Sequence, residues 1–208
     1  MRVRFRKRVL VTCVYIVAIS LSGCADDGPT LSRLAPGAKI LAFGDSLTHG
    51  TGSTRGEDYP TVLARLSGRE VINSGTPGEV SADGLKRLEG ILDSIRPSLM
   101  ILCHGGNDML RKKDLSKTQQ NLVRMIELAK GKGIDVLLVG VPKPGLLLGT
   151  ADFYEEVAEL TGVPSELDVV TDILSKAQFK SDPVHPNARG YTRMAESIFD
   201  VLKRTGAI

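Results

Sequence analysis

An apolar run leads directly into a glycine-bounded serine turn in the stretch ILAFGDSLTHG, residues 40–50. Residues 40–43 have the length and composition of a buried strand, and Gly44 and Gly50 mark a turn after it. From residue 39 onward, similar apolar runs alternate with amphipathic stretches of helical length. This alternation is typical of parallel strands covered by helices. It predicts an α/β fold, a three-layer α/β/α sandwich with a central parallel sheet.

The expected elements follow from the same pattern. We expect strands at Ile40–Phe43, Glu70–Asn73, Leu99–Cys103 and Val136–Val141. We expect helices at Tyr59–Leu66, Ala82–Ile95, Leu115–Lys130, Phe153–Leu160, Leu167–Lys176 and Asn187–Arg204, with Pro186 suited to the first turn of the last helix. The segment 142–181 is the hardest to interpret, because Gly162 and Pro164 interrupt it. In such a fold the functional residues lie on loops at the carboxyl ends of the strands.

The amino terminus has the pattern of an export signal. Basic residues crowd positions 2–8, and the apolar run 9–21 is short for a membrane span of roughly 20 residues. The run ends in LSGC, residues 21–24, which resembles the lipobox of bacterial lipoproteins. We therefore expect a signal peptide over 1–23, a lipidated Cys24 with a tether over 24–38, and one folded domain over 39–208. An ordinary signal-peptidase site or a short membrane anchor are the alternatives.

The charge balance and the cysteine content argue against a nucleic-acid-binding domain and against a domain held together by disulfides. The formal charge is +3, but without the five basic residues of the signal, 22 basic residues face 24 acidic ones, a net charge near −2. This balance excludes an electrostatic footprint for nucleic acid in the domain. Cys13 would leave with the signal, so Cys103 alone remains in the domain and no internal disulfide is possible. We expect Cys103 to be a small buried hydrophobe.

The serine turn is a candidate nucleophile. Ser46 stands where a strand ends, and the flanking glycines favour an exposed hydroxyl. A serine hydroxyl becomes nucleophilic at neutral pH only beside a base. Helix capping is the alternative role for Ser46.

The candidate base lies in the segment DPVHPN, residues 182–187, before the last helix. Asp182 precedes His185 by three residues and can accept the Nδ1 proton, which leaves Nε2 free to accept from a serine. A structural histidine in a helix-entry loop is the alternative.

A candidate oxyanion site follows the most apolar strand, in HGGND, residues 104–108. The glycines allow close backbone approach, and the Asn107 amide offers a donor toward negative charge. The alternative is a turn whose polar side chains bond only to local backbone. The segment NSGTPGE, residues 73–79, follows the second strand and offers a backbone N–H to the same oxyanion.

These segments occur in the order that resembles the SGNH hydrolases, also called the GDSL esterase/lipase family, over residues 39–208. The family's serine, glycine, GxND and DxxHP blocks match Ser46, Gly78, residues 105–108 and residues 182–186. The resemblance implies a flavodoxin-like SGNH hydrolase fold. It implies a catalytic triad of Ser46, Asp182 and His185, and an oxyanion hole made by the Ser46 N–H, the Gly78 N–H and the Asn107 side chain. Gly75 is an alternative to Gly78.

The branch it most resembles contains bacterial arylesterases, thioesterases and lysophospholipases. The sequence thus predicts a serine esterase that hydrolyses carboxylic esters or thioesters through an acyl-enzyme intermediate. We expect an exported lipoprotein on the periplasmic or cell-surface side, held to a membrane through Cys24 and acting as a monomer on a small-molecule or lipid ester. Ala25 after Cys24 favours the outer membrane of a double-membraned cell. The alternatives are a carbohydrate or peptidoglycan O-acetylesterase and a flavodoxin-like binding lipoprotein that uses residues 46–52 as a phosphate loop.

No cofactor or metal is expected, because His49, His104 and His185 show no ligand spacing such as HExxH. We expect His49 and His104 to be exposed polar residues, and the alternative is that they line the pocket. Substrate contacts are expected from Asp45, Leu147 and Leu148, in a pocket whose walls include Leu146 and Phe153.

Overall fold

The computed structural model of the protein describes residues 28–145 and 149–208. The predicted signal peptide, Cys24 and the predicted pocket residues Leu146, Leu147 and Leu148 lie outside the described residues. Leu31 and Leu34, within the predicted tether, are buried, and their N–H groups donate to the carbonyls of Thr205 and Ala207. The packed domain therefore includes this part of the amino-terminal segment.

A five-stranded, all-parallel sheet forms the centre of the molecule, in the order β2-β1-β3-β4-β5. Its strands are β1 (Lys39–Gly44), β2 (Glu70–Gly75), β3 (Leu99–Cys103), β4 (Asp135–Val139) and β5 (Ser165–Glu166). The predicted parallel sheet is confirmed. The two-residue β5 was not predicted.

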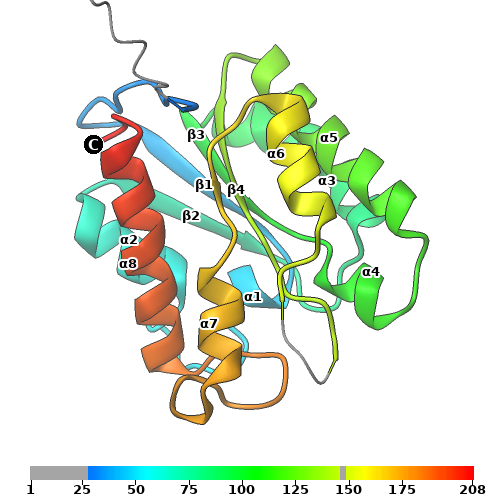
Figure 1. Cartoon of the computed structure of the whole chain (residues 1–208). Coiled ribbons are helices and arrows are strands. Elements are labelled where there is room, and N and C mark those ends of the chain that lie inside the picture. The colour runs from blue at the N-terminus through cyan, green and yellow to red at the C-terminus, as the bar shows by residue number, and fades with distance from the viewer. Residues whose placement is uncertain (1–27, 146–148) are drawn as a thin grey trace, which may run out of the picture.

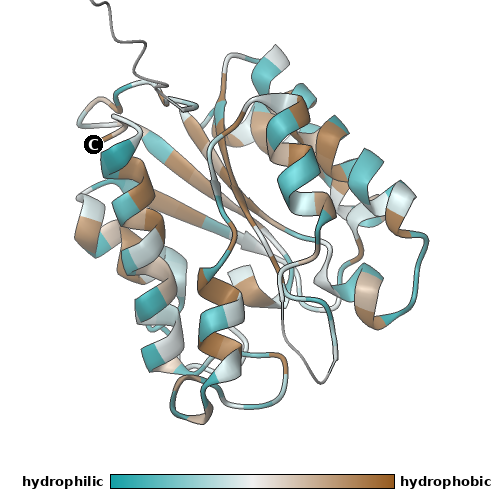
Figure 2. Ribbon diagram, viewed as in Figure 1, coloured by the Kyte–Doolittle hydropathy of each residue, from teal (hydrophilic) through white to brown (hydrophobic). Residues whose placement is uncertain are grey.

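Helices cover both faces of this sheet, as predicted (Figure 1). One layer contains α2 (Tyr59–Ser67), α7 (Val169–Ser175) and α8 (Ala188–Arg204); the other contains α3 (Ser81–Ile95), α5 (Leu115–Gly131) and α6 (Phe153–Thr161). Three short elements lie in loops: α1 (Ser46–His49), α4 (Gly106–Leu110) and the 3₁₀ helix η1 (Ala177–Phe179). Figure 2 shows brown and teal residues on the same long helices. The buried apolar residues of these helices belong to one core cluster with the strands, which explains their amphipathic pattern. Among the described residues, no helix is both long enough and apolar enough to cross a membrane.

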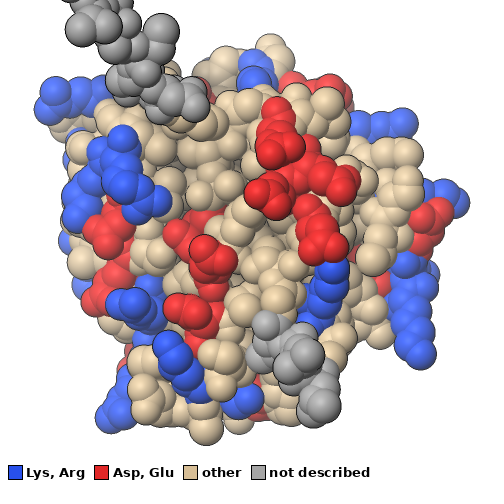
Figure 3. All heavy atoms as spheres, viewed as in Figure 1, with Lys and Arg blue, Asp and Glu red and all other residues tan. Residues whose placement is uncertain are grey.

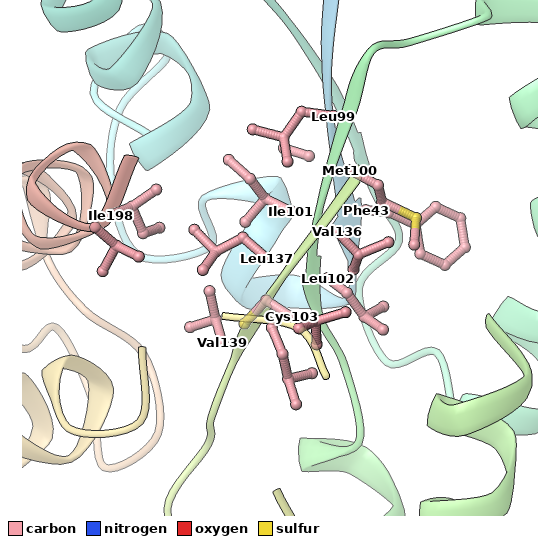
Figure 4. Packing of buried hydrophobic residues seen from close by; sticks show 14 of the residues in the cluster. Phe43, Leu99, Met100, Ile101, Leu102, Cys103, Val136, Leu137, Val139 and Ile198 are labelled. Carbon is pink, nitrogen blue, oxygen red and sulfur yellow. The ribbon is translucent and has the colours of Figure 1, made fainter. Parts of the chain in front are cut away.

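The core is continuous across the central strands. Every residue of β3 is buried, as are all residues of β1 and β4 after the first. Figure 4 shows Phe43, Leu102 and Val139 packed with their neighbours, and Cys103 among them. The prediction for Cys103 is confirmed, since it is fully buried. Burial raises the pKa of its thiol well above the usual value, so it remains protonated.

The start of the last helix differs from the expectation. Asn187 is the N-cap of α8, and its side chain accepts from the N–H groups of Arg189 and Gly190. Pro186 therefore precedes the cap instead of occupying the first turn. The side-chain oxygen of Asn187 satisfies helix N–H groups that have no intrahelical acceptor, which is why the helix begins one residue later.

Both signs of charge are interspersed on the face shown in Figure 3, with acidic side chains gathered over α6. Glu155 and Glu156 lie in the first turn of that helix. Negative charge at a helix amino terminus is favourable.

Candidate active site

Ser46 is the first residue of α1, immediately beyond the carboxyl end of β1. The capping role belongs to Asp45, whose Oδ1 accepts from the Leu47 N–H at 3.1 Å. Gly50 ends the helix after four residues by adopting a left-handed conformation with φ of 95°. This short turn leaves Ser46 partly exposed, at the wall of a cavity.

The serine hydroxyl meets the predicted base. Oγ of Ser46 lies 3.0 Å from Nε2 of His185, although 139 residues separate them. Nδ1 of His185 lies 2.7 Å from Oδ2 of Asp182. Oδ1 of Asp182 accepts from the N–H groups of Val184 and His185. The loop before α8 thus folds back on itself and fixes the carboxylate against the imidazole.

The direction of the hydrogen bond between Asp182 and His185 follows from the ionisation of the carboxyl group. Burial alone would raise the pKa of Asp182, but the hydrogen bonds from His185 and from the Val184 N–H outweigh it and lower that pKa. An ionised carboxylate only accepts hydrogen bonds, so the Nδ1 atom of His185 is the donor. Nε2 is then free to accept from the Ser46 hydroxyl.

The amide of Asn107, in the first turn of α4, is held from two sides. Its Nδ2 atom donates to Oδ2 of Asp45 at 3.1 Å and to the Glu79 carbonyl at 3.0 Å. Both partners are distant in sequence, so the alternative of a turn with purely local bonds is wrong.

Gly75 and Gly78 lie at and after the end of β2, and each was a candidate to donate its backbone N–H to the oxyanion. Gly78 has a φ of 77°, in the left-handed region that glycine adopts without strain, and its carbonyl accepts from Nη2 of Arg111 at 2.7 Å. Within the described chain the Gly78 N–H has no hydrogen-bond partner. The N–H of Gly75 already donates to Oδ1 of Asn73 at 2.9 Å. Gly78, unlike Gly75, also lines the cavity.

These groups share a cavity of about 430 Å³. Ser46, Gly78, Asn107 and His185 line it together with Asp45. The apolar part of its wall comes from Leu47, Leu110, Val141, Leu174 and Val184. Phe153, the first residue of α6, is buried and does not line it, contrary to the expectation for the pocket wall. Burial raises the pKa of Asp45, which is 2% exposed.

The two remaining histidines have different positions. His49 is exposed, as predicted, but His104 is fully buried. The expectation of an exposed polar residue at position 104 is therefore wrong. The imidazole is accommodated in the interior because both ring nitrogens have partners, the Gly105 N–H at 3.0 Å and Oε2 of Glu79 at 3.1 Å.

Sequence reasoning missed the supporting role of Asp108. Its carboxylate accepts from the N–H and the hydroxyl of Ser81, each at 2.8 Å, and so joins α4 to the start of α3. The motif position identified a polar residue, but no local pattern indicated its distant partner. In the described ranges, no group of three or more His, Cys, Asp or Glu side chains is arranged to hold a metal ion.

Comparison with known proteins identifies relatives along most of the chain. Residues 42–193 match the GDSL-like lipase/acylhydrolase family. The chain is 30% identical to the esterase TesA of Pseudomonas aeruginosa, over 89% of this chain and 98% of that protein. It is 28% identical to thioesterase 1/protease 1/lysophospholipase L1 of Escherichia coli K12, over 74% of this chain and 78% of that protein. The crystal structure of AlinE4, an SGNH-hydrolase family esterase, superimposes with a TM-score of 0.64 and 31% identity, covering 83% of this chain and 98% of AlinE4.

Proposed function

The chain belongs to the GDSL-like lipase/acylhydrolase family and is an enzyme that hydrolyses ester bonds. We propose that Ser46 is the nucleophile of this reaction and that its hydroxyl oxygen takes up the acyl group of the substrate. In this proposal His185 is the general base and Asp182 orients it. The observation that carries the proposal is the continuous hydrogen-bonded chain from Ser46 Oγ through His185 to Asp182, with lengths of 3.0 and 2.7 Å.

The chemistry follows from this chain of contacts. The Ser46 oxygen attacks the carbonyl carbon of the ester while its proton moves to Nε2 of His185. The tetrahedral intermediate collapses, His185 gives that proton to the departing alcohol or thiol, and an acyl-enzyme remains. Water then attacks the acyl group with His185 again as base, which releases the acid and restores Ser46.

We assign the oxyanion contacts to the N–H groups of Ser46 and Gly78 and to the Asn107 amide. Ser46 is the first residue of a helix, where the N–H has no intrahelical acceptor, and the Gly78 N–H has no partner among the described residues. Both hydrogens of the Asn107 amide already have acceptors, at 3.0 and 3.1 Å. The developing oxyanion would share one of these hydrogens with its present acceptor in a three-centre hydrogen bond.

The substrate class we propose is an ester or thioester with an acyl chain longer than acetate. The cavity wall is largely apolar, with Val141 and Leu174 buried and Leu110 half exposed at the rim. Burial of acyl methylene groups against such apolar side chains should favour binding by about 0.8 kcal/mol for each methylene group. Relatives named as esterase and as thioesterase/lysophospholipase support an ester or thioester as substrate. The O-acetylesterase alternative predicts the opposite preference, for acetate.

Covalent labelling tests the mechanism. A fluorophosphonate probe should modify Ser46 and no other serine, as read by peptide mass spectrometry. An exposed serine such as Ser175, at the end of α7, is the internal control. Absence of the adduct on Ser46 in active enzyme would refute the proposed nucleophile.

A series of p-nitrophenyl esters of increasing acyl-chain length tests the proposed substrate class. A maximum of kcat/KM at acetate would favour the O-acetylesterase.

We also propose that the protein is an exported lipoprotein anchored through Cys24, on the outer membrane where the cell has two. The LSGC sequence at 21–24 supports this, and the domain itself is compatible with it. Its amino-terminal segment lies beside the carboxyl terminus, at the end of the sheet remote from α1 (Figure 1). An anchor there leaves the cavity open.

Cys24→Ser tests this proposal, since it should move the protein from the membrane fraction to the soluble fraction. A short membrane anchor would keep that variant in the membrane, and an ordinary signal peptide would give soluble protein in both cases.

A further inference from the structure

Three ionisable side chains are clustered beside the cavity without lining it: Glu79, Arg87 and His104. Nε of Arg87 donates to Oε1 of Glu79 at 2.7 Å, and Nη2 donates to Oε2 at 2.7 Å. Nε2 of His104 lies 3.1 Å from the same Oε2 atom. The side chains of His104 and Glu79 are only 0% and 7% exposed. Apolar residues of similar volume often replace a buried ion pair without loss of stability, so stability alone does not account for ionisable side chains at this place.

Each member of the cluster is held in one orientation. The Gly105 N–H donates to Nδ1 of His104 at 3.0 Å, so Nε2 carries the ring proton and donates it to Glu79. The Arg87 guanidinium lies over the ring of Phe43, 4.1 Å from its centroid. Gly84 on α3 makes room for the cluster, because a Cβ at that position would lie 2.5 Å from Nε2 of His104.

The cluster contacts the ends of three adjacent strands. Nη2 of Arg87 donates to the carbonyl of Gly44 at the end of β1 and to that of Ser74 in β2, at 3.2 and 3.0 Å. His104 follows β3 directly. The same three strands lead into Ser46, Gly78 and Asn107, which are the three groups assigned to the oxyanion hole.

Glu79 makes the most direct connection to that hole. It is the residue after Gly78, and its N–H donates to the Thr76 carbonyl at 3.2 Å. Its own carbonyl accepts from Nδ2 of Asn107 at 3.0 Å. The side chain of Glu79 is therefore fixed by Arg87 and His104, while its backbone sets the position of two oxyanion donors.

We propose that Glu79, held by Arg87 and His104, is a positioning residue that aligns the Gly78 N–H and the Asn107 amide for the transition state. The inference rests on the proposed function, since it requires Asn107 to act on the oxyanion. It assigns no contact with substrate to any member of the cluster. Disturbing the cluster should therefore weaken transition-state stabilisation and leave substrate binding nearly unchanged.

A double-mutant cycle between Glu79→Gln and Asn107→Ala tests this, with kcat and KM measured on a p-nitrophenyl ester and folding monitored by thermal unfolding. A glutamine cannot accept from both Arg87 and His104 as the carboxylate does. We expect Glu79→Gln to lower kcat about tenfold with KM within about twofold, less than the roughly 100-fold that a 1 Å misplacement can cost. In the Asn107→Ala background the same change should cost at most about threefold, because residues that act together are not additive.

Glu166→Gln is the matched control. Glu166 also accepts several hydrogen bonds, from Ser197 and from the N–H groups of Asp168 and Val169, but it lies on β5 at the sheet edge. Its kcat should equal that of the wild type. If Glu79→Gln does not fold, Arg87→Lys replaces it in the cycle, since lysine cannot reproduce the fork of contacts.

The two possible failures can be told apart. If Asn107→Ala alone leaves kcat unchanged, the assigned oxyanion hole is wrong and the positioning role is overturned with it. If Asn107→Ala lowers kcat but the Glu79 effect is absent, fully additive or confined to KM, the oxyanion hole stands and the positioning role of Glu79 is overturned.

Discussion

Asp45 and Asn107 are in direct contact across two strand ends: Oδ2 of Asp45 accepts from Nδ2 of Asn107 at 3.1 Å. The residue before the proposed nucleophile thus orients a proposed oxyanion donor. Replacing Asn107 by Ala removes that donor. We expect kcat to fall about 100- to 1000-fold with little change in KM, since one such donor contributes about 3 kcal/mol in the transition state. Steady-state kinetics on a p-nitrophenyl ester measures this. An unchanged kcat would exclude Asn107 from the oxyanion hole.

Substitution of Asp45, the acceptor in this hydrogen bond, gives a separate prediction about stability. Asp45→Ala leaves the buried Leu47 N–H without its acceptor and removes one of the two acceptors of the partly buried Asn107 amide. We expect it to lower the free energy of unfolding by about 1–3 kcal/mol, the cost of an unsatisfied buried group. Asp45→Asn keeps an oxygen acceptor and should lose less. Urea unfolding at pH 7 compares the two, and equal stability of both variants with the wild type would contradict the role given to Asp45.

Ser46→Ala should abolish ester hydrolysis while folding is retained. The change removes one partly exposed oxygen, so thermal unfolding should be nearly unchanged. The loss in kcat should reach about 10⁴- to 10⁶-fold, as when members of a serine triad are removed. Ser175→Ala, at an exposed serine outside the cavity, is the matched control and should keep full activity. Turnover near the wild-type rate in Ser46→Ala would eliminate the proposed mechanism.

The sequence predicts the residues of the proposed triad better than the buried residues that hold the neighbouring loops in place. Ser46, Asp182 and His185 are predictable because each sits in a local motif at a strand end or helix start, and parallel topology brings such positions together. The buried state of His104 was not predictable, since a polar residue after a strand normally faces solvent. Its burial depends on Glu79 and Arg87, which come from other elements. Local periodicity contains no information on which distant side chains will become partners.

The pocket prediction had a related limit. The leucines expected to contact the acyl chain lie outside the described residues, whereas Leu110, Val141 and Leu174 form the described apolar wall. In the sequence these three look like ordinary apolar positions of helices or strand ends. Only the convergence of their elements at one end of the sheet makes them a wall.

Leu110 offers a test of acyl preference without disturbing the core, because it is 47% exposed at the cavity rim. Leu110→Ser should lower kcat/KM for an octanoate ester about fivefold, equivalent to about 1 kcal/mol of lost apolar burial, and leave acetate hydrolysis unchanged. Leu115→Ser is the matched control, since Leu115 is 39% exposed and does not line the cavity. An equal loss on both esters would show that Leu110 does not contact the acyl chain.

The Glu79 carboxylate predicts a specific response to acid. Burial alone would raise its pKa, but the hydrogen bonds from His104 and Arg87 and the charge of Arg87 lower it from 4.5 to about 2. A group whose pKa is lower in the folded state binds its proton more weakly there than when unfolded. Its contribution to stability is therefore complete above pH 4.5 and is lost as the pH falls toward about 2.

Comparison of the wild type with Glu79→Gln isolates this contribution, because all other groups titrate in both proteins. At pH 7 the wild type should be the more stable protein. The difference in the free energy of unfolding should shrink by on the order of 3 kcal/mol between pH 6 and pH 2, as expected for a shift of this size. Urea unfolding at several pH values in that window measures it. A difference that stays constant across the window would mean that Glu79 is not held as an ionised carboxylate by Arg87 and His104, and the structural basis for its positioning role would be lost.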